Sequence, residues 1–403
     1  MIGNGRMSGK FRNFAVEIKK IFVLRCQPNY PPIQNPDNQR YVKKKRDSNL
    51  ELFRVITMLL IIAHHYVVNS DVLSVIRENP SETASGFLML FGAWGKTGIN
   101  CFVLITGYFM CKSSISLHKF LKLVTQVLFY NLLIFGVFVV VGLEDFSMRQ
   151  LLSKILVVKN MNGGFTSGFI MFYLFIPFLS VLVNNLTRRQ HLMLVGLVLL
   201  TFTVFGSMPP ALGISVSVNY VLHFCNLFII ASYVRLHGFP VAVSHRMWGL
   251  GALLSLLAGC AMVLVMLRRF AVAGAPEIPF GPYYWISDSN KILAMSTAFC
   301  AFMWFKDLKL GYSRVINALG GATFGVLLIH ANSNAMRQWL WNELVDCAGH
   351  FTDPLLWVYA PACVIAIFLV CASIDLLRAR FVERHILKWS NRAAIGIRRV
   401  LPV

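Results

Sequence analysis

Charged residues are scarce in this sequence. Asp, Glu, Lys and Arg make up 14% of the 403 residues, whereas hydrophobic residues make up 57%, and the mean hydropathy is +0.63. Apolar runs of about twenty residues, the length that a helix needs to cross a bilayer, recur along the chain. The composition therefore excludes an ordinary soluble domain and predicts an all-α, polytopic integral membrane protein.

Acidic residues are rarer still, with 17 Asp and Glu against 38 Lys and Arg and a formal net charge of +21. The basic residues form short clusters between apolar runs, so we interpret them as topology signals and lipid-headgroup contacts and expect no nucleic-acid partner. Six clusters fall on one side of the predicted spans. We assign this side to the cytoplasmic face of the cell membrane and expect both termini there. The six clusters lie at 43–46, 112–122, 188–189, 235–246, 306–314 and 378–399.

The pattern of cysteines gives no sign of a cross-linked or metal-binding fold. The nine cysteines are odd in number, lie mostly in apolar runs, and show no CxxC or Cys/His ligand spacing. We therefore expect neither a disulfide framework nor a metal site. The first forty residues are polar, basic and rich in proline, so we expect no cleavable signal peptide and insertion by the first spanning helix.

Apolar windows divide the chain into three parts. We expect a basic amphipathic and linker extension at 1–47, a membrane domain at 48–376 and a basic cytoplasmic tail at 377–403. The membrane domain should contain about ten spans. They are predicted near 50–69, 86–110, 121–142, 167–186, 191–208, 219–236, 247–267, 289–305, 315–331 and 354–376.

The segment 144–167 is too charged to span simply and too apolar for a free loop. It contains LLSKILVV followed by the glycine-rich NMNGGFTSG. Two interpretations stay open, a re-entrant or surface element that shapes an outer cavity and an ordinary surface loop on the headgroups.

The first span, within NLELFRVITMLLIIAHHYVVNS, contains Arg54 and His65. Ionisable residues inside a membrane are costly and usually functional. Eleven residues correspond to about three helical turns, so both side chains lie on one face, about 16 Å apart along the axis. His64 points about 100° away, and we expect it to pack against the bundle.

His65 is suited to proton transfer near neutral pH. It could accept the proton of an attacking alcohol, or it could take up an acyl group itself and pass it on. Arg54, near the cytoplasmic end, could bind phosphates, or it could simply pair with Glu51 at i, i+3.

Two further segments accompany this R-x10-H pattern, GKTGINCFVLITGYFMCKS at 95–113 and INALGGATFGVLLIHANSN at 316–334. Together and in this order, the three resemble the membrane acyltransferase 3 family, over about 48–376. The resemblance implies transfer of an acyl group, usually acetyl, from acyl-CoA to a hydroxyl of a surface polysaccharide or lipid-linked glycan. Acetyl-CoA would be a donor substrate, and no bound cofactor is implied.

The resemblance and the residues together define the candidate site. His65 and Arg54 are the catalytic candidates, and none of the candidates is a metal ligand. Four residues are candidates for binding the phosphates of acyl-CoA: Arg54, Lys112, Lys119 and Lys122. The three lysines lie where relatives often have arginines. The preference for basic residues on the cytoplasmic side alone would also explain these lysines. The candidates for the acceptor cavity are Lys96, His330 and Asn69.

One alternative function fits the physical pattern equally well. Interrupted spans with buried ionisable residues also suit a transporter or flippase of a glycan or small solute. Such a protein would bind cargo without consuming acetyl-CoA. The acceptor's identity, the acyl chain length and the choice between a monomer and a homodimer stay open.

Overall fold

The computed structural model describes residues 48–113, 115–159, 164–209, 212–214, 216, 218–273 and 281–383. The expected extension at 1–47 and most of the expected tail lie outside these residues. Within them the chain is all helical, without strands. Seventeen helical elements follow one another: α2 (Ser48–Val68), α3 (Val72–Glu78), α4 (Thr83–Phe91), α5 (Gly95–Met110), α6 (Leu117–Val140), α7 (Met148–Ile155), α8 (Phe165–Asn185), α9 (Arg188–Val198), η2 (Leu199–Val204), α10 (Phe205–Ser207), α11 (Tyr220–His237), α12 (His245–Ala273), α13 (Ile292–Lys306), α14 (Arg314–His330), α15 (Asn334–Gln338), η4 (Trp339–Leu344) and α16 (Leu356–Phe381).

Every predicted span falls on a helix, but the count of about ten is not confirmed. Among the described residues, seven helices are long and apolar enough to cross a membrane, and the pair formed by α14 and α15–η4, bent by 98°, raises the number to eight. The predicted segments at 219–236 and 289–305 correspond to α11 and α13. The first packs between α5 and α8 and buries His223 and Asn226, whereas the second is only 15 residues long. By length and composition, neither of these two helices is counted among the candidate spans of the described residues.

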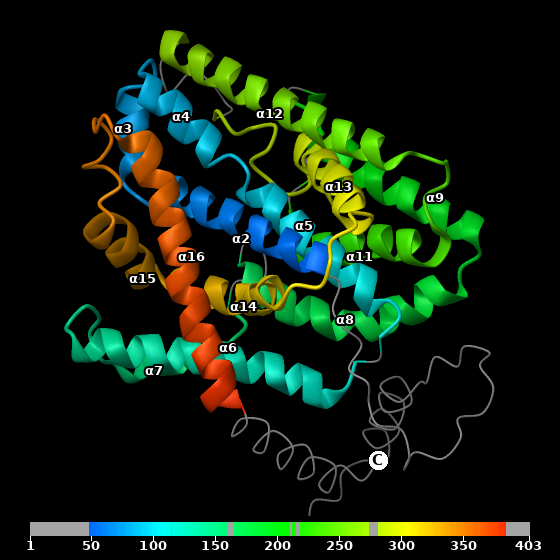
Figure 1. Cartoon of the computed structure of the whole chain (residues 1–403), viewed down its shortest axis with the longest axis horizontal. Coiled ribbons are helices and arrows are strands. Elements are labelled where there is room, and N and C mark those ends of the chain that lie inside the picture. The colour runs from blue at the N-terminus through cyan, green and yellow to red at the C-terminus, as the bar shows by residue number, and fades with distance from the viewer. Residues whose placement is uncertain are drawn as a thin grey trace, which may run out of the picture.

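The helix α2 lies near the centre of the bundle, with α12 along one edge and α6 along the opposite edge (Figure 1). Exposed leucines line the two outer helices, among them Leu132 and Leu133 on α6 and Leu253 and Leu254 on α12. In a membrane protein such surfaces face the lipid tails. The core therefore encloses α2, and the candidate side chains on α2 lie away from lipid.

The helices α2 and α14 run parallel and in register. The hydroxyl oxygen of Ser48 accepts a hydrogen bond from the backbone N–H of Ser313 at 2.9 Å, and His65 contacts His330 near the other end, so both pairs are 265 residues apart in sequence. Between these ends, Gly320 lies against Glu51. A Cβ at Gly320 would be 2.7 Å from the Cβ of Glu51, so only glycine permits this approach.

The helix α5 runs antiparallel to α2. Gly95, at the start of α5, touches the ring of His64, and Gly98, one turn later, touches Ile61. The C-terminal end of α5 therefore lies at the same end of the bundle as Arg54. The basic residues that follow α5 are thus brought to the N-terminal end of α2, which we call the inner end.

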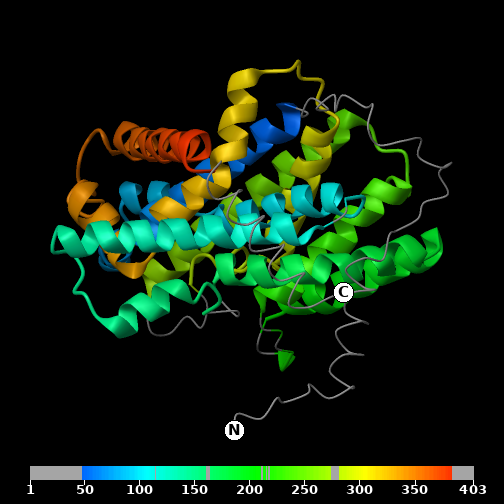
Figure 2. The ribbon, with the colours of Figure 1, turned by 90° about the horizontal axis from the view of Figure 1, so that it is seen from below.

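The short helix α7 lies on the surface, folded back against α6 (Figure 2). None of its eight residues is buried, and its apolar side chains Met148, Leu152 and Ile155 are exposed. In the described part of 144–167 the chain thus forms a helical surface element, and its role in shaping an outer cavity stays a prediction. An amphipathic helix of this kind suits the headgroup boundary.

Candidate functional site

Two histidines from distant parts of the chain meet in the bundle. Nδ1 of His65 is 3.0 Å from Nε2 of His330, and the ring centroids are 5.2 Å apart. His330 is fully buried and His65 only partly. The register of α2 with α14 creates this pair, because each histidine lies seventeen residues after the serine of the Ser48–Ser313 contact.

The hydrogen bonds define which nitrogens carry protons. Nδ1 of His330 is 2.7 Å from the carbonyl oxygen of Val326, and since a carbonyl only accepts, this nitrogen must be the donor. In a neutral imidazole the other nitrogen, Nε2, is then an acceptor, so Nδ1–H of His65 must donate to it. This leaves the lone pair of His65 on Nε2, where it can accept a proton from a substrate.

The neighbouring His64 has a structural role, as expected from its direction on the helix. Its Nδ1 donates to the carbonyl oxygen of Gly92 at 2.6 Å. Its ring packs on Gly95 so closely that any Cβ there would collide with it. Of the two adjacent histidines, only His65 is directed toward α14.

Lys96 lies near the histidine pair. Its Nζ donates to the hydroxyl of Tyr220 at 2.8 Å and lies 5.4 Å from the centroid of the same ring. Lys96 on α5 and Arg337 on α15 are both close enough to act electrostatically on His65. Positive charge from two elements suits a site in which an anion binds or forms.

A polar cavity of about 180 Å³ opens one turn beyond His65, at the C-terminal end of α2, which we call the outer end. Asn69, whose backbone N–H donates to the carbonyl oxygen of His65 at 3.1 Å, is part of its wall. The structure thus places Asn69 in the wall of this cavity, one helical turn beyond His65. The cavity is lined by Val68, Asn69, Ser70, Asp71, Asn334, Arg337 and Gln338.

Arg337 is a functional candidate that the sequence did not predict. It follows the break after α14, so helical spacing from His330 does not relate it to the site. The sequence did contain one signal. Arg337 is a basic residue at the predicted outer end of a span, whereas basic residues normally cluster on the cytoplasmic side.

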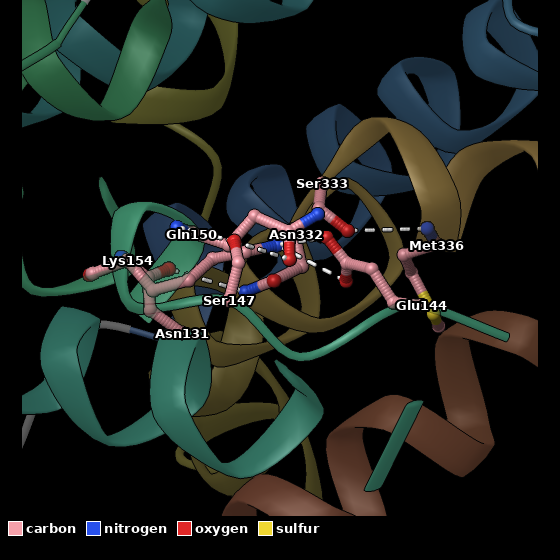
Figure 3. A network of polar contacts seen from close by, with 8 residues as sticks. All are labelled: Asn131, Glu144, Ser147, Gln150, Lys154, Asn332, Ser333 and Met336. Carbon is pink, nitrogen blue, oxygen red and sulfur yellow. Dashed lines mark hydrogen bonds and ion pairs between the residues drawn. The ribbon is translucent and has the colours of Figure 1, made fainter. Parts of the chain in front are cut away.

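A polar network holds this break in the chain (Figure 3). The side-chain amide of Asn332 donates to the carbonyl of Leu328 at 3.0 Å and to Oδ1 of Asn131 on α6 at 3.3 Å. Asn131 in turn donates to the carbonyl of Lys154 on α7 at 3.1 Å, and Lys154 forms an ion pair with Glu144 at 2.9 Å. The bend that separates His330 from Arg337 is thus fixed to the α6–α7 hairpin.

The other predicted residues lie at the inner end. Arg54 donates from its Nη1 to Oε1 of Glu51 at 2.8 Å, so the simple pairing interpretation is realised, although 22% of the Arg54 side chain stays exposed. Arg54 lies about three turns from His65 and does not contact it.

The three lysines also lie at this end. Lys112 is exposed on the turn after α5, and Nζ of Lys119 is 3.2 Å from the hydroxyl of Ser113. Lys122 forms an ion pair with Glu383 beyond the end of α16. The predicted residues therefore separate into an inner basic group and a pair of histidines beside an outer cavity.

Comparison with known proteins gives one match. A family model described as an acyltransferase domain matches residues 47–376, which is most of the chain. Searches of curated proteins and of solved structures find no match.

Proposed function

The chain belongs to the membrane acyltransferase 3 family, and from this premise we propose that it transfers an acetyl group from acetyl-CoA to a hydroxyl of a surface polysaccharide or lipid-linked glycan. The family consists of acyltransferases, so the chain is an enzyme that transfers acyl groups. The donor and the acceptor are our proposal. One observation carries the catalytic part of the proposal, the transfer assisted by His65: the hydrogen bond from Nδ1 of His65 to Nε2 of His330.

In the proposed reaction, Nε2 of His65 accepts the proton of the acceptor hydroxyl as its oxygen attacks the carbonyl carbon of the thioester. The tetrahedral intermediate collapses, the C–S bond breaks, and the thiolate of coenzyme A leaves with the proton from His65. His330 remains neutral and accepts the Nδ1–H bond throughout. It thereby holds the ring with Nε2 toward the substrate.

A covalent route uses the same residues. Nε2 of His65 attacks the carbonyl carbon of the thioester, the C–S bond breaks and coenzyme A leaves as the thiolate. The acceptor hydroxyl then attacks the acetyl carbon, the C–N bond breaks, and the hydroxyl proton passes to the freed Nε2, from which it is released to the thiolate or to solvent. Membranes treated with labelled acetyl-CoA without acceptor, then denatured rapidly, separate the two routes. Label bound to the protein, and absent from His65→Ala, would indicate the covalent route.

The separation of the two groups of residues suits coenzyme A. This donor has phosphates at one end and the thioester at the other, joined by an extended arm. Arg54, Lys112 and Lys119 at the inner end could bind the phosphates, while the arm reaches about three helical turns along α2 to His65. We accordingly propose that the protein lies in the cell membrane, with its inner end and both termini on the cytoplasmic side. The distribution of the basic clusters supports this orientation.

Transfer of labelled acetyl from acetyl-CoA into surface polysaccharide tests the proposal. Membranes with equal amounts of wild type, His65→Ala and the control His350→Ala are compared, since His350 lies in the loop before α16, away from the pair. We expect His65→Ala to lose on the order of 10²-fold or more of the rate, and the control to keep it. Normal transfer by His65→Ala would refute the role of His65, and the absence of transfer by wild type to any acceptor would refute the donor and acceptor assignment.

A further inference from the structure

Arg337 is directed into the outer cavity without a counter-ion. Within the residues that the structure describes, its guanidinium makes no hydrogen bond or ion pair, and its buried Nε has no acceptor. The side chain is only partly exposed. A guanidinium stays charged in proteins, so a half-buried one whose Nε lacks an acceptor is costly, and a negatively charged ligand would offset this cost.

The cavity wall is rigid and mostly neutral. The backbone N–H of Asp71 donates to Oδ1 of Asn342 at 3.0 Å, and the amide of Asn342 donates to Oε1 of Gln338 at 2.7 Å. Trp341, fully buried, packs edge-on against Tyr66 of α2 at a centroid distance of 5.9 Å. The segment that carries Arg337 is therefore held to α2 through Tyr66 and to the turn after α2 through Asp71.

Asp71 is the one carboxylate among the residues that line this cavity. It is exposed, and the structure shows no ion pair between it and Arg337. The remaining polar lining consists of amides and a hydroxyl, which suit the hydroxyl groups of a sugar. Arg337 is thus available to an anion that enters with the ligand.

We propose that the cavity binds an acidic acceptor, with Arg337 holding a carboxylate or phosphate of the saccharide that is to be acylated. This inference deepens the proposed function and rests on it for the identity of the ligand as acceptor. Planar guanidinium groups hold such oxyanions by two parallel hydrogen bonds. The cavity begins about one turn from His65, so a saccharide anchored there can present a neighbouring hydroxyl to Nε2.

A competing role for Arg337 is stabilisation of the negative charge that develops on the thioester oxygen. In that role Arg337 would act on every acceptor alike and would affect kcat. Recognition of an acidic acceptor instead affects the binding of charged acceptors alone. The two roles are therefore separable by the choice of acceptor.

Binding to the full-length protein in detergent, without acyl-CoA, is the first test. The probes are methyl β-glucoside, methyl β-glucuronide and glucose 1-phosphate, so that the carboxylate and phosphate sources are compared with an uncharged sugar. We expect wild type to bind at least one charged probe roughly ten- to a hundredfold more tightly than the glucoside, and Arg337→Gln to lose this difference. The control Arg77→Gln, an exposed arginine at the same end, should keep it.

Equal affinity of wild type for all three probes, or an unchanged preference in Arg337→Gln, would overturn the proposal. Asp71→Asn gives an independent check. This substitution removes a negative charge from the cavity, so it should preserve or increase the preference for charged probes. A loss of the preference would show that the preference depends on Asp71 rather than on Arg337.

Transfer assays separate this inference from the proposed function. With a charged acceptor, Arg337→Gln should raise KM roughly ten- to a hundredfold with kcat little changed, and Arg337→Lys should fall between it and wild type. An equal fall of kcat for charged and uncharged acceptors would overturn recognition in favour of the electrostatic role. If wild type prefers charged probes but transfers no acetyl, the proposed reaction fails while the anion site stands.

Discussion

His65 is oriented by His330, which is itself oriented by its own helix. Nδ1–H of His330 is held by the Val326 carbonyl at 2.7 Å, so its Nε2 accepts from Nδ1–H of His65 at 3.0 Å. Unlike a carboxylate in the same position, a neutral imidazole adds no negative charge inside the membrane. The pair thus fixes a base without a buried anion, which would be costly there.

His330→Ala removes the acceptor of the His65 N–H, and we expect it to lower kcat by about 10²-fold while KM for the donor changes little. His330→Gln retains an oxygen acceptor at a similar position and should recover part of the activity. The measurement is the rate of acetyl transfer at saturating substrates, with protein levels matched. Equal activity of the two variants would show that His330 acts through packing rather than through its hydrogen bond.

The close contact between α2 and α14 at Gly320 predicts a large effect of one methyl group. Gly320→Ala should destabilise the protein by about 1–3 kcal/mol and reduce transfer, because a Cβ would press on Glu51 and separate the helices. Gly136→Ala is the matched control, since a Cβ there meets nothing within 4 Å, and it should be neutral or slightly stabilising. Thermal unfolding in detergent measures both, and similar melting temperatures for the two variants would contradict the packing argument.

The Arg54–Glu51 pair allows the two roles of Arg54 to be separated. If Arg54 binds the phosphates of the donor, Arg54→Ala should raise KM for acetyl-CoA about tenfold or more, while Glu51→Gln leaves KM within about threefold of wild type. If the pair is only structural, both variants should lower stability alike and leave KM unchanged. Donor KM and melting temperature, determined for both variants, decide between them.

The lysines after α5 should differ in their contribution to donor binding. Lys112→Ala combined with Lys119→Ala should raise KM for acetyl-CoA by several-fold at low salt and by less at high salt, because exposed charges are screened. Lys122→Ala should have a smaller effect, since Glu383 already neutralises Lys122. Titration of KM against salt concentration measures this, and a salt-independent KM in wild type would argue against phosphate binding at this end.

Acid should weaken the loop that precedes α16. The backbone N–H of Leu355 and then the imidazole of His350 hold the pKa of Asp353 below its ordinary value of 3.8. A lowered pKa in the folded state means that this contribution to stability is present above about pH 3.8 and is lost as the pH falls through the folded-state pKa. Asp353→Asn should therefore melt below wild type at pH 6 and converge with it in strong acid; a constant difference would show that the carboxylate charge is not involved.

Much of the bundle could be predicted from apolar runs, because lipid contact and burial both demand them. The same fact limits the prediction. The apolar runs at α11 and α13 resemble spans in the sequence, yet α11 is largely enclosed by other helices and α13 is short. Only the packing distinguishes an interior helix from one that faces lipid.

The candidate site was predictable where it depends on one helix. The spacing of Arg54 and His65 defines their common face, and the direction of His64 follows from the same geometry. The pairing of His65 with His330 depends on two helices in register 265 residues apart, which no local pattern contains, and only the family resemblance suggested His330. Arg337 lies beyond a 98° bend, so periodicity could not relate it to the others.

The parallel pairing of α2 with α14 also governs when the enzyme can become active during its synthesis. His65, the proposed base, is made among the first residues of the membrane domain, whereas His330, which holds its ring, is made 265 residues later. Contacts so distant in sequence form late, after many intervening helices have been inserted. A partly synthesised chain therefore has His65 but not its orienting partner, so we expect the proposed transfer to begin only once α14 is in place.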